Sequence, residues 1–379
     1  MKRHTITPRA DWQQKVENIG FGFHTLDTTY WDESVYYELS MKEVDAIEKA
    51  TNDLWIICLD AVQHVIDEKL YAKFHIPEWI IPHIEASWND DVPAIYGRFD
   101  FTFKNGIPKL LEFNADTPTS LFESSVVQWF WLQDLYPGKD QFNSIHEKLI
   151  AYWKYLQEYL HDDTLYFSCI KDNLEDLTTT EYMRDCAIQA GLGTKFIFMD
   201  EIGWDLTTPV FLDLENNPIS NIFKLYPWEW LLNEGFGKNI ARDRNKAFWI
   251  EPSWKMILSN KAILPLLWEL NNGHPNLLES YFETDNFKLG INYAKKPLLS
   301  REGQNIQLVD YGSTIAETPG EYGEEGFIYQ ELCLLPEFDK NYPLIGSWII
   351  GQESAGIGIR ESETLITDNM SRFVPHLIS

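Results

Sequence analysis

The stretch that decides the fold is YGRFDFTFKNGIPKLLEFNAD, residues 96–116. Phenylalanines occupy the odd positions 99, 101 and 103, and polar residues occupy the even positions between them. This alternation, followed by the turn dipeptide Asn105-Gly106, predicts a β-hairpin with one buried face. The other face carries an arginine, two carboxylates and an amide, namely Arg98, Asp100, Glu112 and Asn114.

The turn of this hairpin decides which side chains share a face, because a slip of one residue reverses every side chain. A two-residue turn at 105–106 would place Asp100 and Glu112 on opposite faces. A three-residue turn at 104–106, with its glycine in a left-handed conformation, places Arg98 opposite Glu112 and gathers the polar residues. We therefore expect the three-residue turn, with a dry face made of Phe99, Phe103, Leu111 and Phe113.

The polar face is a candidate metal site. Two carboxylates and an amide oxygen, from Asp100, Glu112 and Asn114, are hard ligands that suit Mg²⁺. A surface Arg–Glu pair beside a solvated aspartate would give the same pattern, and the hairpin alone leaves both interpretations open. The adjacent segment NADTPTS, residues 114–120, adds small polar residues able to contact a ligand.

Composition excludes several classes of protein. The 379 residues are 44% hydrophobic and 23% charged, which is typical of a folded globular chain. A formal net charge of −27 would repel nucleic acid. Four widely spaced cysteines favour neither structural zinc nor a disulfide framework. Without a signal peptide or an apolar run of membrane length, we expect a cytoplasmic protein that binds no membrane.

Helical and strand patterns mix along the chain, so we expect an α+β (mixed α/β) fold with interleaved subdomains. Residues 34–71 read as mostly helical, with Ser40 and Glu43 as a capping box. Strand, helix and strand patterns over 165–199 predict a βαβ unit in a parallel sheet. We further expect a hairpin across 216–218, a helix over 253–273 with a kink or break at Pro265, and an antiparallel or mixed sheet from residue 290.

Cations in separate segments suggest phosphate binding without any of the common sequence motifs. No P-loop, dinucleotide fingerprint, HExxH motif or nucleophile elbow occurs. Lys261 lies in an apolar helical segment, while Lys296, Arg301 and Arg360 lie in or beside glycine-bearing segments. Such a set suits the clamping of a nucleotide's phosphates, and scattered surface cations are the alternative.

Five segments together resemble the synthetase module of glutathionylspermidine synthase, an ATP-grasp ligase. They are YGRFDF…LLEFNADTPTS, SNKAILPLLWEL…GHPNLL, YAKKPLLSREGQNI, IYQELCLLP and GIGIRESETLI. The resemblance implies one synthetase module over 1–379. A preATP-grasp βαβ part would occupy about 160–205, and an ATP-grasp part would combine about 250–379 with 95–120. The chain has no room for the amidase domain of bifunctional members, so it resembles the stand-alone synthetase-like proteins.

The resemblance also implies a reaction and the residues that perform it. The γ-phosphate of ATP passes to a substrate carboxylate, and an amine then attacks the acyl phosphate to form an amide. The resemblance implies that Asp100, Glu112 and Asn114 are the ligands of two Mg²⁺ ions. Lys261 and Lys296 would contact the phosphates of ATP, and Gln330 with the backbone near Leu332 would contact its adenine. Arg98 would steady the transferred phosphoryl group, while Arg301 and Arg360 would act in catalysis and in binding the acid substrate.

The substrate residues match the family less well. Thr117 and Thr119 stand where members that use glutathione tend to have serines, and Glu175-Asp176 aligns with an acidic pair associated with the polyamine. Asn369 and Arg372 depart from the family pattern, and an arginine there would reverse the charge near a cationic substrate. We expect an ATP- and Mg²⁺-dependent ligase that joins a peptide-like acid, such as glutathione, to a polyamine or another amine. The alternatives are a non-catalytic member that binds nucleotide or polyamine, and a metal-dependent phosphohydrolase.

Overall fold

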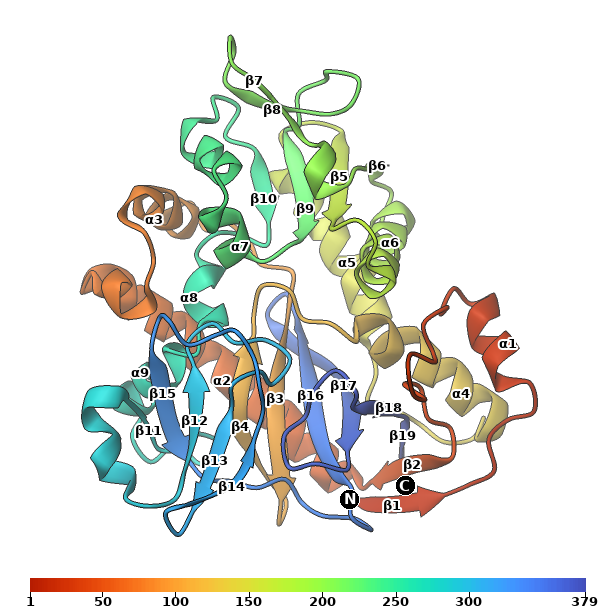
Figure 1. The fold of residues 1–379 in the computed structure, drawn as a ribbon. Helices are drawn as coiled ribbons and strands as arrows, with labels where there is room; N and C mark the ends of the chain where they lie inside the picture. Colours follow the sequence, from red (N-terminus) through yellow and green to blue (C-terminus); the bar gives the residue numbers. More distant parts are fainter.

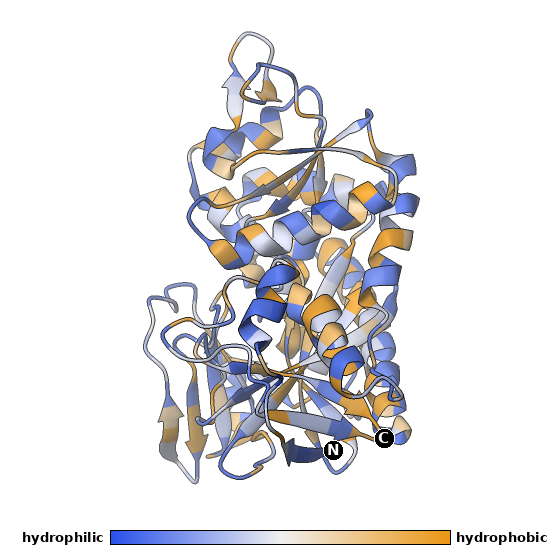
Figure 2. Cartoon of the chain, turned by 90° about the vertical axis from the view of Figure 1, so that its right-hand side faces the viewer, coloured by the Kyte–Doolittle hydropathy of each residue, from blue (hydrophilic) through white to orange (hydrophobic).

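The computed structural model describes residues 1–379 and has two lobes. In Figure 1 a parallel sheet stands above two antiparallel sheets, and both chain termini lie together at the bottom of the view. Figure 2 shows hydrophobic and hydrophilic residues mixed along the helices, as expected of helices that bury one face. The α+β class follows, with helices and strands interleaved along the chain rather than separated.

The central antiparallel sheet has the order β18-β17-β16-β3-β4. Its strands are β3 (Tyr96–Lys104), β4 (Ile107–Asn114), β16 (Tyr342–Ile350), β17 (Glu353–Ser362) and β18 (Arg372–Val374). The long helix α2 (Met41–Asp67) packs across β4, β16 and β17. The expected capping box begins this helix, since Glu43 accepts hydrogen bonds from the backbone and hydroxyl of Ser40.

The β3–β4 hairpin corrects the expected turn but keeps the expected polar face. Lys104 pairs with Ile107, so the loop is the two-residue turn Asn105-Gly106, and both residues have positive φ, 56° and 76°. The three-residue prediction was therefore wrong. The register shifts between Asp100 and Phe101, where Leu111 is an additional residue on β4. Beyond this bulge the pairs are Asp100 with Glu112 and Arg98 with Asn114, instead of Arg98 with Glu112.

The bulge explains how both faces are satisfied with a short turn. Phe99, Phe103 and Phe113 are buried on the dry face as expected, and Phe101 is buried beside them. Leu110 takes the dry position that we expected for Leu111, and Leu111 lies at the wall of a cavity instead. One extra residue thus resets the alternation, as β-bulges do near functional sites.

A second antiparallel sheet flanks the first, with the order β11-β15-β12-β13-β14. It contains β11 (Ser280–Phe282), β12 (Tyr293–Pro297), β13 (Gln307–Asp310), β14 (Ser313–Glu317) and β15 (Phe327–Glu331). In the ladder between β12 and β15, Ala294 pairs with Gln330 and Lys296 with Ile328. The antiparallel sheets expected after residue 290 are therefore present.

The upper lobe contains the expected βαβ unit. Strands β5 (Thr164–Cys169) and β6 (Gly193–Phe196) pair in parallel, joined by α6 (Leu174–Gln189), which packs on β5. The four-stranded sheet is completed by β9 (Asn221–Leu225) and β10 (Phe248–Ile250) in the order β10-β9-β5-β6.

The hairpin expected across residues 216–218 is present only as a short antiparallel contact, in which Leu212 bridges Pro218 and the Ile219 N–H donates to the Phe211 carbonyl. The strand before that turn, β8 (Val210–Leu212), makes its full ladder with β7 (Gly203–Asp205), while β9 joins the parallel sheet. Every residue of β9 is buried, and a strand buried on both faces belongs inside a parallel sheet. The Asp213 carboxylate accepts the backbone N–H groups of Glu215 and Asn217, which closes the turn locally.

The break in the helical segment 253–273 lies before Pro265. Helix α8 (Lys255–Ser259) ends at Asn260, and α9 (Ile263–Leu270) begins after a short turn. The Asn260 side chain accepts the N–H of Ala262, and Pro265 lies in the first turn of α9, where a proline disrupts no helical hydrogen bond. The turn presents Lys261, whose backbone N–H is held by Leu298.

The remaining elements are divided between the two lobes. A small sheet, β1-β2-β19, joins the two ends of the chain. No helix has the length and apolar character needed to cross a membrane. The elements are β1 (Lys2–Thr5), α1 (Trp12–Asn18), β2 (Val35–Leu39), α3 (Ile81–Asn89), α4 (Gln128–Leu135), α5 (Ile145–Leu156), α7 (Trp228–Asn233) and β19 (His376–Ile378).

Candidate active site

One cavity of about 230 Å³ lies between the two antiparallel sheets, reaches the upper lobe at Glu175 and Glu229, and collects nearly all of the predicted site residues. Its walls come from the polar face of β3 and β4, from β12 and β15, from the first turn of α6, and from the loops after β12 and β17. Of the predicted residues, only Asp176 lies outside the lining, which contains Arg98, Asp100, Glu112, Asn114, Thr117, Thr119, Glu175, Lys261, Lys296, Arg301, Gln330, Leu332 and Arg360.

The arginine and aspartate of β3 form a bidentate pair in this cavity. Arg98 Nε lies 2.6 Å from Asp100 Oδ1, and Arg98 Nη2 lies 2.9 Å from Asp100 Oδ2. Arg98 also donates to the Thr119 carbonyl at 2.6 Å, which ties β3 to the loop after β4. Asn114 bridges the two carboxylates, because its Nδ2 lies 3.0 Å from Asp100 Oδ2 and 3.3 Å from Glu112 Oε1.

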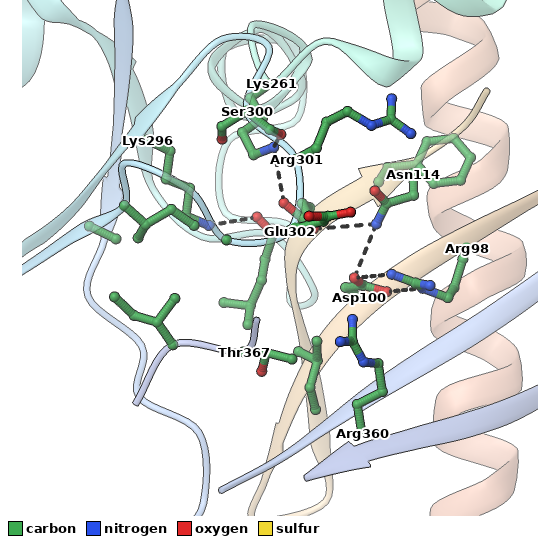
Figure 3. Close-up of a pocket in the computed structure, with 18 of the residues that line it drawn as sticks. Arg98, Asp100, Asn114, Lys261, Lys296, Ser300, Arg301, Glu302, Arg360 and Thr367 are labelled. Carbon is green, nitrogen blue, oxygen red and sulfur yellow. Dashed lines mark hydrogen bonds and ion pairs between the residues drawn. The ribbon is translucent and has the colours of Figure 1, made fainter. Parts of the chain in front are cut away.

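Two lysines face the polar strands from the opposite wall (Figure 3). Lys261 Nζ lies 3.1 Å from Glu112 Oε2 and 2.6 Å from the Ser300 carbonyl. Lys296 Nζ lies 2.8 Å from the carbonyl of Leu111, the bulge residue, and 2.7 Å from Gln330 Oε1. Because Leu111 is the bulge residue, its carbonyl is free to accept from Lys296. In a regular strand this carbonyl would have paired with the neighbouring strand.

These contacts shift the acid–base properties of the cluster. Burial opposes the ionisation of Glu112, but Lys261 and Lys296 outweigh it and lower the pKa of Glu112 to about 2. Burial lowers the pKa of Lys296 to about 8, although Glu112 acts in the opposite direction. The glutamate is a carboxylate at neutral pH, whereas the lysine lies close to its titration point.

The other two predicted arginines come from loops and strand ends. Arg301 Nη1 lies 3.0 Å from Glu229 Oε1, and Arg301 also donates to the hydroxyl of Thr117. Arg360 donates to the carbonyl of Asp368, while its Nε is buried without a partner. Arg360 therefore retains an unused donor beside the cavity.

Of the acidic pair on α6, Glu175 lines the cavity and Asp176 does not. Asn173 caps the helix by accepting the N–H of Asp176 at 3.0 Å, and Glu175 in the first turn lines the cavity. Asp176 lies behind it, where burial and then Glu175 raise the pKa of Asp176 to about 7. Burial also raises the pKa of Glu175.

The expected charge reversal by Arg372 was wrong, because this arginine does not line the cavity. It pairs with Glu361 at 2.8 Å and with Asp32 at 3.4 Å. Asn369 does line the cavity and donates to the carboxylate of Glu302. Of the two residues that depart from the family pattern, only Asn369 lines the cavity, and its side chain is neutral.

Several lining residues were missed from the sequence, including Tyr30, Ser120, Glu229 and Glu302. Tyr30 lies far from every motif in sequence, and only the fold brings it to the cavity. Glu229 lies at the start of α7, shortly after the buried strand β9. No motif in the sequence marks it as a site residue. Asp116, which had no assigned role, accepts Lys224 Nζ at 2.8 Å and the Trp228 N–H at 2.8 Å, and so joins the two lobes.

The donor chemistry of the polar face fits Mg²⁺. No group of three or more His, Cys, Asp or Glu side chains forms a complete protein cage. Two carboxylates and an amide on one wall correspond to the partial site that Mg²⁺ uses when phosphates complete its coordination. Asn114 lies within hydrogen-bonding distance of both Asp100 and Glu112, so the three side chains could share one ligand.

Comparison with known proteins gives the family. The pattern described as "Glutathionylspermidine synthase preATP-grasp" matches residues 3–379, and the chain belongs to this family. A Haemophilus influenzae protein named as an acid–amine ligase is 39% identical over 99% of both chains. Trypanothione synthetase of Crithidia fasciculata is 30% identical over 83% of this chain and 52% of its own length. The bifunctional glutathionylspermidine synthetase/amidase of Escherichia coli is 28% identical over 90% of this chain and 59% of its own length.

These relatives bear ligase and synthetase names, and the family is one of carbon–nitrogen ligases. The prediction that the chain is an acid–amine ligase by class is therefore confirmed. A glutathione synthetase-like effector from Globodera pallida has a similar structure, with a TM-score of 0.56 at 10% identity over 91% of this chain and 89% of that one. This likeness concerns the fold, and it confirms the expected α+β class.

Proposed function

We propose that this protein joins a peptide-like acid to an amine in an ATP- and Mg²⁺-dependent reaction that proceeds through an acyl phosphate. The observation that carries the proposal is the convergence of Arg98, Asp100, Glu112, Lys261 and Lys296 on one cavity. These residues come from three separate segments of the chain. Arg98 bonds Asp100, Lys261 bonds Glu112, and Lys296 bonds the carbonyl of Leu111, the residue before Glu112.

The proposed roles follow from charge and position. Lys261 and Lys296 bind the phosphates of ATP, and Gln330 with the backbone near Leu332 contacts the adenine. Asp100, Glu112 and Asn114 hold Mg²⁺, which supplies positive charge that offsets the charge of the transferred phosphoryl group when bound. Arg98 steadies that phosphoryl group from the neighbouring strand position.

The acid and the amine occupy the side of the cavity that faces the upper lobe. Arg301 and Arg360, which both line the cavity, bind the acid. Thr117 and Thr119 line the path to it, and glutathione is the proposed type of acid. Glu175, supported by Asp176, attracts a cationic amine such as spermidine.

The two lobes then correspond to two functional parts. We assign about 160–205 to the preATP-grasp part, and 95–120 with about 250–379 to the ATP-grasp part. Asp116 of the ATP-grasp part forms a buried ion pair with Lys224 on β9 of the parallel sheet, which links the two lobes. Closure of the cavity would exclude water, which an acyl phosphate requires because water hydrolyses it.

Release of ADP tests this proposal when acids are combined with amines. Glutathione and short peptides are each paired with spermidine, putrescine or amino acids in the presence of ATP and Mg²⁺. ADP that forms only when acid and amine are both present supports the ligase. Phosphate release without an acid or an amine would favour a phosphohydrolase, and tight ATP binding without turnover would favour a non-catalytic protein.

A further inference from the structure

A buried carboxyl group behind the cavity has no role in the proposed reaction. Glu123 is 0% exposed, and it begins a π-helical turn, Glu123–Val127, after the loop that follows β4. Its Oε1 accepts a hydrogen bond of 2.6 Å from the hydroxyl of Tyr30, while its Oε2 is buried without any partner. A buried carboxylate without a cation is costly, so this arrangement requires an explanation.

Tyr30 connects Glu123 to the cavity. The tyrosine lines the cavity, and its hydroxyl lies 3.1 Å from the hydroxyl of Ser120, a second lining residue. Ser120 has a φ of 66°, an uncommon conformation for a residue with a side chain. Strained backbone of this kind persists where the surrounding structure holds it, and it clusters at functional sites.

The charges around Glu123 favour exchange of a proton. Glu175 on α6 opposes its ionisation, Tyr30 and Arg360 favour ionisation, and burial outweighs both. The result is a pKa of Glu123 raised to about 7. A carboxyl group in this range can both accept and release a proton near neutral pH.

The amine of the proposed reaction needs such a group. An alkyl amine resembles the lysine side chain, with a pKa of about 10.4, and is an ammonium ion at neutral pH without a free electron pair. It must lose a proton before it can attack. Four carboxylates of the cavity are already paired with cations, namely Asp100 with Arg98, Glu112 with Lys261, Asp116 with Lys224 and Glu229 with Arg301. Glu175 has the separate role of attracting the ammonium group in the proposed function.

We propose that Tyr30 and Glu123 together accept the proton that the amine substrate loses when it attacks. This inference rests on the proposed function and adds a catalytic residue, Tyr30, and a positioning residue, Glu123, to it. One proton passes from the ammonium ion to Tyr30 Oη as Tyr30 passes its own proton to Glu123. The nitrogen then forms a bond to the acyl carbon, the bond from that carbon to the phosphate oxygen breaks, and the second amine proton leaves on the phosphate.

Hydroxylamine separates this step from the formation of the acyl phosphate. It is already unprotonated at neutral pH, so it can trap an acyl phosphate as a hydroxamate without a proton acceptor. Wild-type protein, Glu123→Gln and Tyr30→Phe are compared with ATP, Mg²⁺ and glutathione, using either spermidine or hydroxylamine. Glutamine keeps an acceptor for the Tyr30 hydroxyl, and therefore preserves the structural contact.

We expect both variants to form amide with spermidine about 10²-fold more slowly, the lower range for loss of acid–base catalysis, while hydroxamate formation changes little. Raising the pH should restore amide formation, because it removes the proton from spermidine directly. Tyr182→Phe is the matched control, since Tyr182 is an equally buried tyrosine that bonds His146 and does not line the cavity. It should leave both rates unchanged.

The outcomes distinguish this inference from the proposed function. If the variants lose amide and hydroxamate equally, or lose neither, Tyr30 and Glu123 do not accept the proton. If the wild-type protein forms neither product, the proposed reaction with glutathione is wrong, and this inference fails with it.

Discussion

Asp100 faces Glu112 across the β3–β4 ladder, although the turn that joins these strands has only two residues. The pairing depends on Leu111, the extra residue that shifts the register by one. Without this bulge the two carboxylates would point to opposite sides of the sheet. The shift also turns the Leu111 carbonyl toward Lys296, so one local irregularity serves both walls of the cavity.

Replacement of Glu112 by glutamine should abolish the metal-dependent reaction. The amide keeps the size of the side chain but removes a charge that Mg²⁺ and Lys261 both use, so we expect at least a ~10²-fold loss of ADP release. Circular dichroism should show an unchanged fold. Glu353→Gln is the control, because Glu353 is an exposed carboxylate that pairs with Lys148 away from the cavity. Near-normal activity of Glu112→Gln would remove the hairpin from the mechanism.

The buried pair of Asp116 and Lys224 should hold the two lobes together. Both side chains are almost fully buried, and the ion pair is 2.8 Å long. Asp116→Asn leaves the Lys224 ammonium without its partner charge, and we expect a loss of about 3–5 kcal/mol in the free energy of unfolding. Urea denaturation measures it. Adding Lys224→Met should recover part of the loss, whereas additive losses in the double variant would show that the pair is not coupled.

The stability of the protein should depend on pH through Glu123. Because burial raises the folded-state pKa of Glu123 to about 7, the folded protein holds a proton between pH 4.5 and 7 that the unfolded chain has released. The associated stabilisation is complete below about pH 4.5 and disappears as pH rises through 7, with an upper limit of about 3 kcal/mol. Urea denaturation at pH 5 and pH 8 should show the wild-type protein losing stability relative to Glu123→Gln. The reverse trend would mean that Glu123 is ionised in the folded state.

Arg372 should matter for stability and leave the choice of amine unchanged. Its partners Glu361 and Asp32 lie outside the cavity, and Glu361 keeps hydrogen bonds from Arg3 and Tyr37 when the arginine is removed. We expect Arg372→Met to lower the free energy of unfolding by about 1 kcal/mol. The KM for the amine should be unchanged. A change in the preference among spermidine, putrescine and amino acids would place Arg372 in the substrate path.

The parts of the fold that depend on local pattern were predictable, and those that depend on distant partners were not. Alternation in residues 99–104 predicted the two faces of β3, and Asn105-Gly106 predicted a turn after it, although the length of that turn was predicted wrongly. No residue near Leu111 predicts the bulge, because the contact that uses it comes from Lys296 on a distant strand. The same holds for β9, which the sequence places beside a turn but which pairs with strands from elsewhere in the chain.

The candidate site was predictable where motifs marked it. The resemblance supplied residues from five segments, and all but Asp176 of the predicted set line one cavity. Tyr30, Glu123 and Glu229 lie in no such motif, and their positions depend on packing between elements that are distant in sequence. The break before α9 was placed at Pro265, because proline is the stronger local signal. The break instead lies at Asn260, five residues before Pro265, where the Asn260 side chain accepts the N–H of Ala262.

Oxygen-18 transfer tests the central claim most directly. The acid is labelled with ¹⁸O in its carboxylate and incubated with ATP, Mg²⁺ and the amine that supports the fastest ADP release. If the carboxylate receives the γ-phosphate and the amine then displaces it, one ¹⁸O atom should appear in the released inorganic phosphate for each amide formed, as read by mass spectrometry. Amide formation with unlabelled phosphate would contradict the acyl phosphate, and with it the role assigned to Arg98, Lys261 and Lys296.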